Sequence, residues 1–452
     1  MTRVLSYREA LGDALRAELA RDERVIVLGQ DVGARGGAYG VTAGLLEAFG
    51  AERVRDAPGS EAAVVGLGIG AAMAGLRPVV ELTTAAYAAL ALDQLAHHAA
   101  PLRTLSGGRL TAPLVVRMPQ TAGGRLGPVH SATVEGLFHH IPGLTVWAPS
   151  TPADARAMLV AAIRADDPVV VLEHTLLYDL RGPVDDAATT AGAGAAIRRS
   201  GRDVTITAAS RMTSVALAAA ELLATEHGIE ADVVDLRTLR PLDHAAVLAS
   251  VARTGHAVLV EEGPPAGGPT ATLAATIATS RPGTPIARVT GADTPTPYAA
   301  ALERAALPGA DAIVAAVRAL VPRGAGPARE RAAGPAQSRA TEIDMEALIT
   351  ARRATGTSLA ALIADAAGPL VTDAVVITDG DGPTIVLGAP PSIAPVTIHL
   401  GPVATRPRAH AGAVTIHHVA TLTLAVESGE DIDATTLLTT LREQLERPAT
   451  RG

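Results

Sequence analysis

The amino-acid sequence predicts an α/β protein built on parallel sheets that helices cover on both faces. Short apolar runs alternate with helical patterns in the first part of the chain, and we expect strands at residues 24–28, 78–82, 113–117, 144–148 and 168–173. This alternation is typical of parallel strands that are joined by helices. The sequence therefore predicts a first α/β domain over residues 1–190.

A second α/β domain is predicted over residues 191–321. Its expected elements are strands at residues 203–208, 231–236 and 257–261, a helix at 213–225 and a last helix that ends at residue 320. Residues 322–340 are rich in Pro, Ala, Arg and Gly, which is typical of a linker. Residues 341–452 would form a third domain, and a length of 452 residues agrees with about three domains.

The composition excludes several kinds of chemistry. The net charge is -8 and there is no basic cluster, so nothing favours nucleic acid as a partner. The chain has no cysteine, which excludes disulfides, thiolate catalysis and zinc–cysteine sites. It also has no lysine and no asparagine, so Schiff-base chemistry, a P-loop lysine and a lipoyl attachment site are excluded.

The first residues, MTRVLSYREALGDAL, are predicted to form an amphipathic helix. Ser6 and Glu9 have the spacing of a capping box, in which each side chain accepts a hydrogen bond from the other residue's backbone. The segment lacks the features of a signal peptide, so we expect a cytoplasmic protein.

A lone carboxylate, Glu61, opens a long run of small and apolar residues. Ser60 can cap a helix here, and an acid in the first turn suits the positive end of the helix dipole. Gly66, Gly68 and Gly70 weaken such a helix by roughly 1 kcal/mol each. This cost suggests that another backbone packs very close. Glu61 would then lie at the mouth of a buried interface, where its surroundings tune a carboxylate for proton transfer.

Two other interpretations of this run are disfavoured. A membrane helix needs about 20 uninterrupted apolar residues, and Arg77 and Pro78 interrupt the run, so we expect no membrane partner. A dinucleotide fingerprint starting near Val64 would need its acid about 20 residues further on. Glu81 follows too soon for a full crossover helix.

Several long motifs in residues 1–321 resemble one family. They are VIVLGQDVGARGGAYGVTAGLLEAFG, DAPGSEAAVVGLGIGAAMAGLRPVVE, PGLTVWAPSTPADA, AAIRADDPVVVLEH, VVDLRTLRPLD and RVTGADTPTPYAAALE. Together they resemble the β subunit of the E1 component of 2-oxo acid dehydrogenases, the thiamine-diphosphate enzymes that act on pyruvate or branched-chain 2-oxo acids. The resemblance implies a transketolase-like pyrimidine-binding domain followed by a transketolase C-terminal-like domain.

The resemblance implies roles for four residues. Glu61 is expected to bind the pyrimidine ring nitrogen of thiamine diphosphate and to favour the form that removes the C2 proton. His130, in GRLGPVHSATVE, is expected to face the substrate and then the lipoyl group, where an imidazole can pass a proton near pH 7. Tyr87 resembles the aromatic residue that packs on the aminopyrimidine. Gly59 stands where the family has a large apolar residue beside the cofactor.

Ordinary structural roles compete with these assignments. His130 is one of 13 histidines, and a lone histidine is usually a surface or structural residue. Tyr87 also fits a core position on an amphipathic helix. The chain departs from the family at Gln30, where an acid is usual, and at Val129 and Ala132, where glutamines are usual. These departures bear on cofactor affinity and substrate handling.

The resemblance also implies metal ions and a partner. A structural potassium ion is held in the family mainly by main-chain oxygens, and the matching positions are Leu114, Ala162, Ile163, Ala165 and Asp167. The family binds magnesium and the diphosphate through a Gly-Asp-Gly motif and an asparagine on a separate α subunit. The Gly-Asp-Gly at residues 380–382 has no asparagine to follow it, so we expect a turn there. An E1 α subunit would then complete the site in an α2β2 assembly.

Residues 341–452 resemble a shortened catalytic domain of E2, the dihydrolipoyl acyltransferase, and so predict a small α+β domain. The motifs TEIDMEALITARR, GAPPSIAPVTIHLGPVATRPRAHAGAVTIHHVATLTLAVE and DATTLLTTLREQLERP carry this resemblance. The family's catalytic Asp-His-Arg aligns with Glu427, Ser428 and Gly429. Because Ser428 cannot accept a proton at neutral pH, we expect a degenerate domain that serves assembly, docking onto an E2 core or onto a second copy.

Three functions remain open on the sequence. The favoured function is that of an E1 β subunit that decarboxylates a 2-oxo acid with an α subunit and passes the acyl group to a lipoyl domain. A transketolase-like carboligase would instead join the aldehyde unit to a carbonyl acceptor. A noncatalytic scaffold would agree with the departures at Gln30, Gly59 and Val129. Nothing in the sequence selects the 2-oxo acid.

Overall fold

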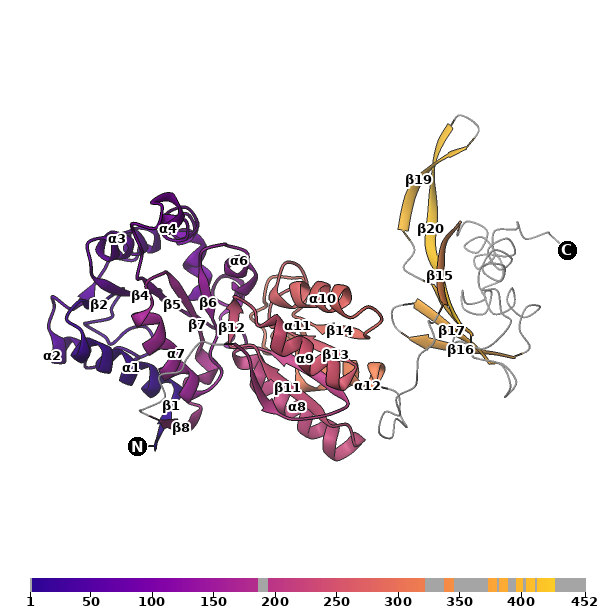
Figure 1. Cartoon of the computed structure of the whole chain (residues 1–452), viewed down its shortest axis with the longest axis horizontal. Coiled ribbons are helices and arrows are strands. Elements are labelled where there is room, and N and C mark those ends of the chain that lie inside the picture. The colour runs from indigo at the N-terminus through magenta and orange to yellow at the C-terminus, as the bar shows by residue number, and fades with distance from the viewer. Residues whose placement is uncertain are drawn as a thin grey trace. The chain divides into compact units, whose positions relative to one another are not determined.

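The computed structural model describes residues 2–185 and 194–321, and beyond them the strands that lie between residues 337 and 426. The chain divides into two units, residues 1–325 and residues 326–452. Figure 1 shows their elements with the labels used below. The boundary predicted near residue 190 falls in residues 186–193, outside the described part of the chain.

A seven-stranded sheet organises the first half of the first unit. Its order is β12-β6-β7-β5-β4-β2-β3, and every neighbouring pair is parallel except β12 with β6. Its strands are β2 (Val25–Gly29), β3 (Val54–Asp56), β4 (Arg77–Glu81), β5 (Val115–Gln120), β6 (Thr145–Trp147), β7 (Val169–His174) and β12 (Thr238–Arg240). The predicted α/β class and the five predicted strands of this domain are therefore confirmed.

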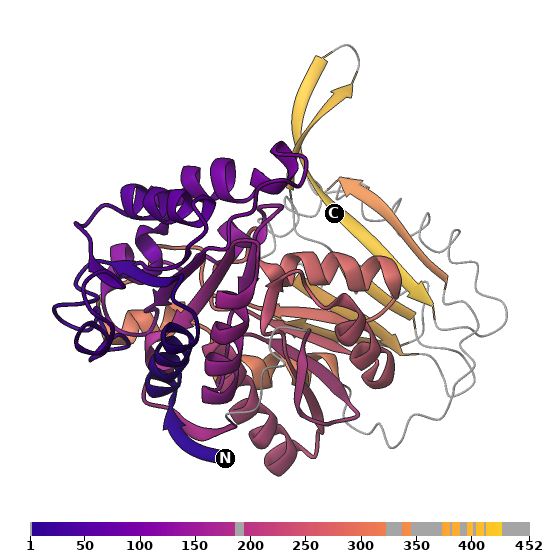
Figure 2. The ribbon, with the colours of Figure 1, turned by 60° about the vertical axis from the view of Figure 1, so that its left-hand side comes forward.

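Helices cover both faces of this sheet, as the alternating side chains of β2 show. Val25 and Val27 pack into one core with α1 (Tyr7–Arg21) and α7 (Pro152–Arg164), whereas Ile26 and Leu28 pack into another with α3 (Glu61–Met73). A strand that is buried on both faces has to be apolar at every position, and all five positions of β2 are buried. Figure 2 shows the strands between the two layers of helices.

The remaining helices of this half are short. They are α2 (Leu45–Phe49), the 3-10 helices η1 (Ala85–Ala91) and η3 (Thr175–Leu177), the π-helix η2 (Gln94–Ala99), α4 (Leu102–Leu105), α5 (Gly127–His130) and α6 (Glu135–His139). Several of them follow strand ends and so shape the same edge of the sheet.

The N-terminus departs from the prediction in one respect. Residues Thr2–Ser6 form strand β1, which pairs with β8 (Arg181–Asp185), and the helix α1 begins only at Tyr7. The predicted capping box is present: the Glu9 amide donates to Ser6 Oγ (3.1 Å) and the Ser6 amide donates to Glu9 Oε2 (2.7 Å). The pairing with β8, which the local pattern could not indicate, draws the first residues into a strand.

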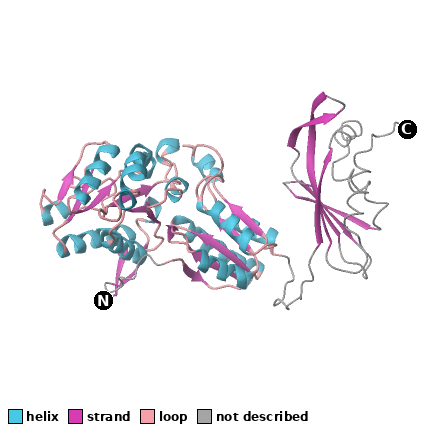
Figure 3. Cartoon of the chain, turned by 45° about the horizontal axis from the view of Figure 1, so that its top comes forward, coloured by secondary structure: helices cyan, strands magenta, loops and turns pink. Residues whose placement is uncertain are grey.

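A five-stranded sheet organises the second half of the unit, in the order β14-β13-β10-β11-β9. Its strands are β9 (Ala196–Arg199), β10 (Val204–Ala208), β11 (Ala231–Asp235), β13 (Ala257–Val260) and β14 (Ile286–Val289). The helices around it are α8 (Arg211–His227), α9 (His244–Thr254), α10 (Pro269–Ser280), α11 (Ala300–Ala306) and α12 (Ala310–Leu320). The strands and helices predicted here are confirmed, and Figure 3 shows the helices, in cyan, around the strands.

Strand β12 connects the two halves. It follows β11 in the sequence, yet it pairs antiparallel with β6 of the seven-stranded sheet, with Thr238 opposite Trp147 and Arg240 opposite Val146. The second half therefore contributes an edge strand to the sheet of the first. This pairing holds the two halves together within one unit.

The described strands of the second unit form an antiparallel sheet in the order β15-β20-β18-β17-β16, with β19 also paired to β20. They are β15 (Gln337–Asp344), β16 (Asp373–Asp379), β17 (Gly382–Gly388), β18 (Val396–Leu400), β19 (Ala404–His410) and β20 (Ala413–Val426). β15 begins inside the range that was predicted as a linker. The residues aligned with the acyltransferase motif, 427–429, and Gly380 and Asp381 of the predicted turn lie outside the described residues.

Candidate functional site

The residues predicted to bind the cofactor and the substrate lie near one edge of the seven-stranded sheet. Parallel strands end at the same edge, and β3, β4 and β5 run in one direction. Glu61 comes shortly after β3, Tyr87 shortly after β4, and His130 at the end of the loop that follows β5. Ligands of open α/β sheets bind at this carboxyl edge. The topology therefore brings together residues that are far apart in the sequence.

Glu61 is the first residue of α3 and is partly buried. It lines a small pocket with Gln30, Gly59, Glu81 and Thr83. Ser60 precedes the helix, but its side chain makes no capping hydrogen bond, contrary to the structural role weighed for it. Glu61 lies in the first turn of the helix, beside the pocket. The helical backbone of residues 61–73 also excludes the dinucleotide interpretation, which needed a strand there.

The pocket beside Glu61 is an incomplete enclosure. Its volume is about 10 Å³, which is roughly the space that one water molecule needs. Gly59 is already close to Gln30, since a Cβ at Gly59 would lie 3.0 Å from Gln30 Oε1. A carboxylate and an adjacent glycine fit one edge of a pyrimidine ring. The described residues do not enclose such a ring, so a further wall is needed from outside them.

Tyr87 and His130 are in contact. Their ring centroids are 5.4 Å apart at an interplanar angle of 61°, an edge-on arrangement. The His130 carbonyl accepts hydrogen bonds from Thr84 Oγ1 (3.4 Å) and from Thr121 Oγ1, which fix α5 against the start of η1. Both rings are partly buried. Two residues that were predicted separately thus form one aromatic pair beside the sheet edge.

The loop that carries His130 is also held by the second half of the unit. The Arg125 amide donates to both carboxylate oxygens of Glu303 on α11, at 3.0 and 3.2 Å. The ring of Tyr298 covers Gly127, where a Cβ would lie 2.3 Å from the ring. Gly127 has φ of +72°, so a side chain is disfavoured there on two counts. The motif TGADTPTPYAAALE contains Tyr298, but sequence spacing could not place it on this loop.

A buried ion-pair cluster lies under the pocket. Arg117 is fully buried and donates to Glu173 Oε1 (2.6 Å) and Oε2 (2.9 Å) and to Glu81 Oε2 (2.5 Å), and Tyr178 donates to Glu173 Oε2 (2.7 Å). Burial raises the pKa of Glu81, and Arg117 opposes that rise. Because Glu81 also lines the pocket beside Glu61, this cluster fixes the pocket floor. Sequence reasoning did not assign these residues a role here.

Asp56 fixes the glycine-rich loop of residues 29–40 at the same edge of the sheet by hydrogen bonds. Its two carboxylate oxygens accept from the Gly33 amide (2.7 Å) and the Ala34 amide (3.0 Å). Thr42 reinforces the loop, since its Oγ1 donates to the Val32 carbonyl (2.7 Å). The residues before Glu61 thus position a second loop as well as the helix.

Four of the five main-chain oxygens predicted to hold potassium already accept hydrogen bonds. Arg77 Nη1 donates to the carbonyls of Ile163 (2.9 Å) and Ala165 (2.8 Å), and the Asp167 carboxylate accepts from Arg103 Nε at 2.8 and 3.1 Å. The Leu114 carbonyl accepts from the Val169 amide and the Ala162 carbonyl from the Ala165 amide. The Arg77 guanidinium therefore supplies positive charge at two of the predicted carbonyls, and the Arg103 guanidinium supplies it at the Asp167 side chain. Potassium at these positions stays a prediction.

Within residues 2–185 and 194–321, no group of three or more His, Asp or Glu side chains has an arrangement that could hold a metal ion. Among the helices that the structure describes, none is both long enough and apolar enough to cross a membrane.

The comparisons with known proteins match the two halves separately. Residues 3–180 match the family described as transketolase, pyrimidine binding domain, and residues 193–313 match transketolase, C-terminal domain. A solved structure described as a split gene transketolase, inactive β4 tetramer, has a TM-score of 0.59 and 26% sequence identity, and the match covers 70% of this chain and 98% of that chain. The fold and the site edge thus define residues 3–180 and 193–313 as a transketolase-like pair of domains.

Individual relatives identify one family within this class. The chain is 44% identical to the pyruvate dehydrogenase E1 component subunit beta-1, mitochondrial, of Arabidopsis thaliana, over 69% of this chain and 88% of that protein. It is 41% identical to the 2-oxoisovalerate dehydrogenase subunit beta of Bacillus subtilis, over 70% of this chain and 98% of that protein. The chain belongs to the family of β subunits of the E1 component of 2-oxo acid dehydrogenases.

Proposed function

We propose that this chain is the β subunit of a thiamine-diphosphate-dependent E1 that decarboxylates a 2-oxo acid with an α subunit and transfers the acyl group to a lipoyl domain. The observation that supports it most directly is the half-open pocket, in which Glu61 lies beside Gly59 at the carboxyl edge of the sheet. The family membership agrees with this pocket. The relatives named above act on pyruvate or on 2-oxoisovalerate, and the choice between such acids stays open.

Three residues of this chain would have separate roles in cofactor binding and proton transfer. Glu61 would hold a proton against the pyrimidine nitrogen, and Tyr87 would pack against the pyrimidine ring. His130 would move a proton at the substrate oxygen, with its orientation set by the contact with Tyr87. Thiamine diphosphate, when bound, supplies the carbon chemistry that amino acids lack. The α subunit would supply the second wall of the pocket and the magnesium ligands.

Replacing one carboxylate tests this proposal. The chain is mixed with an E1 α subunit, thiamine diphosphate and magnesium, and the turnover of pyruvate and branched-chain 2-oxo acids is followed with a dye acceptor. We expect Glu61→Gln to lower kcat by about 10²–10⁴-fold, the range of a proton-transfer group. Glu47→Gln is the matched control, because Glu47 also lies in the first turn of a helix but is exposed. Equal activity of the two variants would contradict the role of Glu61.

The likeness to a split gene transketolase supports a second candidate. In that case the complex would transfer an aldehyde unit to a carbonyl acceptor instead of a lipoyl group. Offering the assembled complex a lipoyl domain or an aldehyde, and analysing the acylated or ligated product, separates the two reactions. No turnover with any 2-oxo acid, in a complex that does form, would support the noncatalytic scaffold instead.

A further inference from the structure

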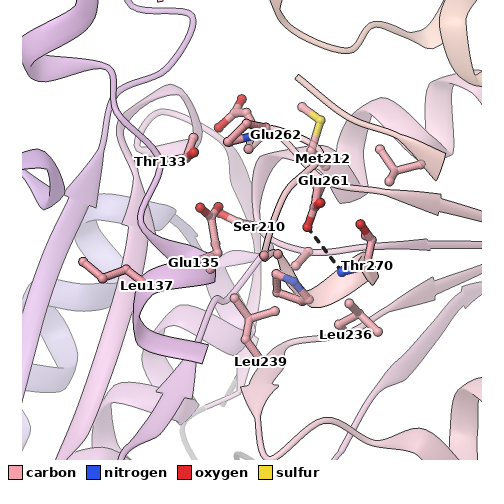
Figure 4. Close-up of a pocket in the computed structure, with 18 of the residues that line it drawn as sticks. Thr133, Glu135, Leu137, Ser210, Met212, Leu236, Leu239, Glu261, Glu262 and Thr270 are labelled. Atoms are coloured by element: carbon pink, nitrogen blue, oxygen red, sulfur yellow. Dashed lines mark hydrogen bonds between the residues drawn. The ribbon is translucent and has the colours of Figure 1, made fainter. Parts of the chain in front are cut away.

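A second cavity lies between the two halves of the first unit, apart from the pocket beside Glu61. Its volume is about 280 Å³. One wall comes from the segment around α6, including Thr133 and Leu137, and the other from the strand ends of the second sheet. Figure 4 shows carboxylates in its upper part and Leu137, Leu236 and Leu239 below. The cavity is large enough for a small organic molecule, since a site of about 150 Å³ already accepts benzene.

Two of the three carboxylates at this cavity are balanced by arginines. Glu261 accepts from Arg288 Nη2 (2.7 Å) and from the Thr270 amide (3.3 Å). Glu262 pairs with Arg211 and with His174 Nε2 (3.0 Å). Their charges are therefore neutralised within the fold.

Glu135 is the third carboxylate, and its partner is neutral. The side-chain amide of Gln120 donates to Glu135 Oε1 at 2.9 Å, and Gln120 is itself held by the Val134 amide (3.2 Å). Burial, together with the charges of Glu262 and Glu261, raises the pKa of Glu135 to about 7. A cation bound beside it would offset this unfavourable environment.

Ser210 provides the independent observation. Its side chain is 5% exposed, it lines the cavity, and its hydroxyl has no hydrogen-bond partner among the described residues. A buried hydroxyl without a partner is uncommon and costs free energy. A ligand in the cavity would satisfy it. Ser210 also has φ of +50°, so the turn between β10 and α8 holds this residue in a backbone conformation that favours glycine.

We infer that this cavity binds a small primary ammonium compound with a compact apolar body, whose ammonium group donates to Glu135 and Ser210 while its apolar part packs on Leu137, Leu236 and Leu239. Pro264 and Ala266 line the cavity and are exposed, so we place its opening there. The inference does not depend on the proposed function, because none of these residues lies in the pocket beside Glu61.

The pairing of the ammonium group with Glu135 determines how the affinity for the amine changes with pH. An ammonium group requires an ionised Glu135, and a primary amine stays protonated well above pH 8. Between pH 6 and pH 8 the carboxylate ionises, so the affinity should rise with pH. Gln120, Glu261 and Glu262 surround Glu135, and Arg288 and His174 lie behind the two glutamates. Arg211 lines the cavity itself, with its charge paired to Glu262.

Calorimetric titration of the full-length chain tests the inference. The probe is 2-phenylethylamine, and 2-phenylethanol is its neutral counterpart of the same shape. At pH 8 we expect the amine to bind at least tenfold more tightly than the alcohol, and we expect the ratio to shrink at pH 6. Absence of binding by the amine, or equal binding of amine and alcohol at pH 8, would overturn the inference.

Three variants locate the binding. Glu135→Gln should reduce the affinity for the amine to that of the alcohol, and Ser210→Ala should weaken it several-fold. Ala266→Trp changes an exposed residue at the opening, so it should fold normally and block both probes. Glu226→Gln, at an exposed position of α8 outside the cavity lining, is the control that should bind as the unaltered chain does. Amine binding that survives both Glu135→Gln and Ala266→Trp would place it elsewhere and refute the site.

Discussion

Arg117 on β5 forms buried ion pairs with Glu81 on β4 and Glu173 on β7, the strands on either side of it. Its side chain and that of Glu173 are fully buried, and that of Glu81 is 4% exposed. A buried group of charges is tolerated in the folded state only when every charge has its partner. A buried carboxylate that loses its cation strongly destabilises the fold. The contribution of Arg117 to the free energy of unfolding is therefore measured best by replacing Arg117.

We predict that Arg117→Met lowers the free energy of unfolding by about 3–5 kcal/mol. The measurement is urea-induced unfolding followed by circular dichroism. Arg55→Met is the matched control, because its partner Glu52 is 89% exposed and exposed pairs contribute about 1 kcal/mol or less. A loss for Arg117→Met as small as that for Arg55→Met would show that the cluster does not stabilise the fold.

Glu135 makes stability depend on pH in the direction opposite to that of most carboxylates. Its pKa is about 7 in the folded chain, against an ordinary value of 4.5. The folded state therefore binds the proton more tightly, so this contribution is complete below about pH 4.5 and is lost as the pH rises through 7. The full effect is on the order of 3 kcal/mol, at about 1.4 kcal/mol for each unit of pKa.

We predict that Glu135→Gln stabilises the chain at pH 8 relative to the unaltered protein and that this advantage disappears near pH 5. Glutamine keeps an oxygen that accepts from Gln120, so the hydrogen bond survives. Unfolding midpoints measured in urea at half-unit pH steps from 5 to 8 give the comparison. Parallel curves for the two proteins would mean that Glu135 titrates normally.

At the scale of the element, α3 shows which of its glycines are needed. A Cβ at Gly68 would lie 2.8 Å from Val80 Cγ2 and 3.0 Å from Leu114 Cδ1, whereas a Cβ at Gly70 would meet nothing within 4 Å. The close neighbours of Gly68 are therefore buried side chains, and not the second backbone that the glycine content suggested. Gly70 is exposed in this chain.

The two glycines are expected to respond in opposite ways to alanine. Gly70→Ala should stabilise the isolated chain by up to about 1 kcal/mol, because alanine favours the helix. Gly68→Ala should destabilise it by about 1–2 kcal/mol, since overpacking outweighs that gain. Thermal unfolding of both variants checks the sign, and a stabilising Gly68→Ala would show that Val80 and Leu114 move aside easily.

Elements also show where sequence patterns reach their limit. The apolar run of β2 predicts a strand because burial on both faces requires apolar side chains at every position. The same kind of reasoning assigned residues 2–6 to a helix, yet they form β1 because β8 offers a partner about 180 residues away. Local periodicity carries no information about such a partner.

At the scale of the whole molecule, the second unit differs from the first in the architecture of its sheet. Its described strands form one antiparallel sheet, and we propose that the unit serves assembly. A chain that ends at Val321 keeps every described element of the first unit. We predict that it unfolds at nearly the same temperature as that unit in the full chain but forms smaller assemblies. Light scattering on both chains, with and without an E1 α subunit, checks this, and an unchanged assembly mass would argue against the role.

By itself the sequence determined the α/β class, most of the strands and the residues around Glu61, because these depend on local apolar patterns and on long motifs. Only the tertiary structure decided that Tyr87 contacts His130, that Arg77 reaches the carbonyls of Ile163 and Ala165, and that Glu135 shares a cavity with Ser210. The physical reason is that these contacts join residues of different helices, strands and loops, and whether such residues meet depends on the order of the strands in the sheet. Strand order is set by the packing of the whole unit, which no short stretch of sequence records.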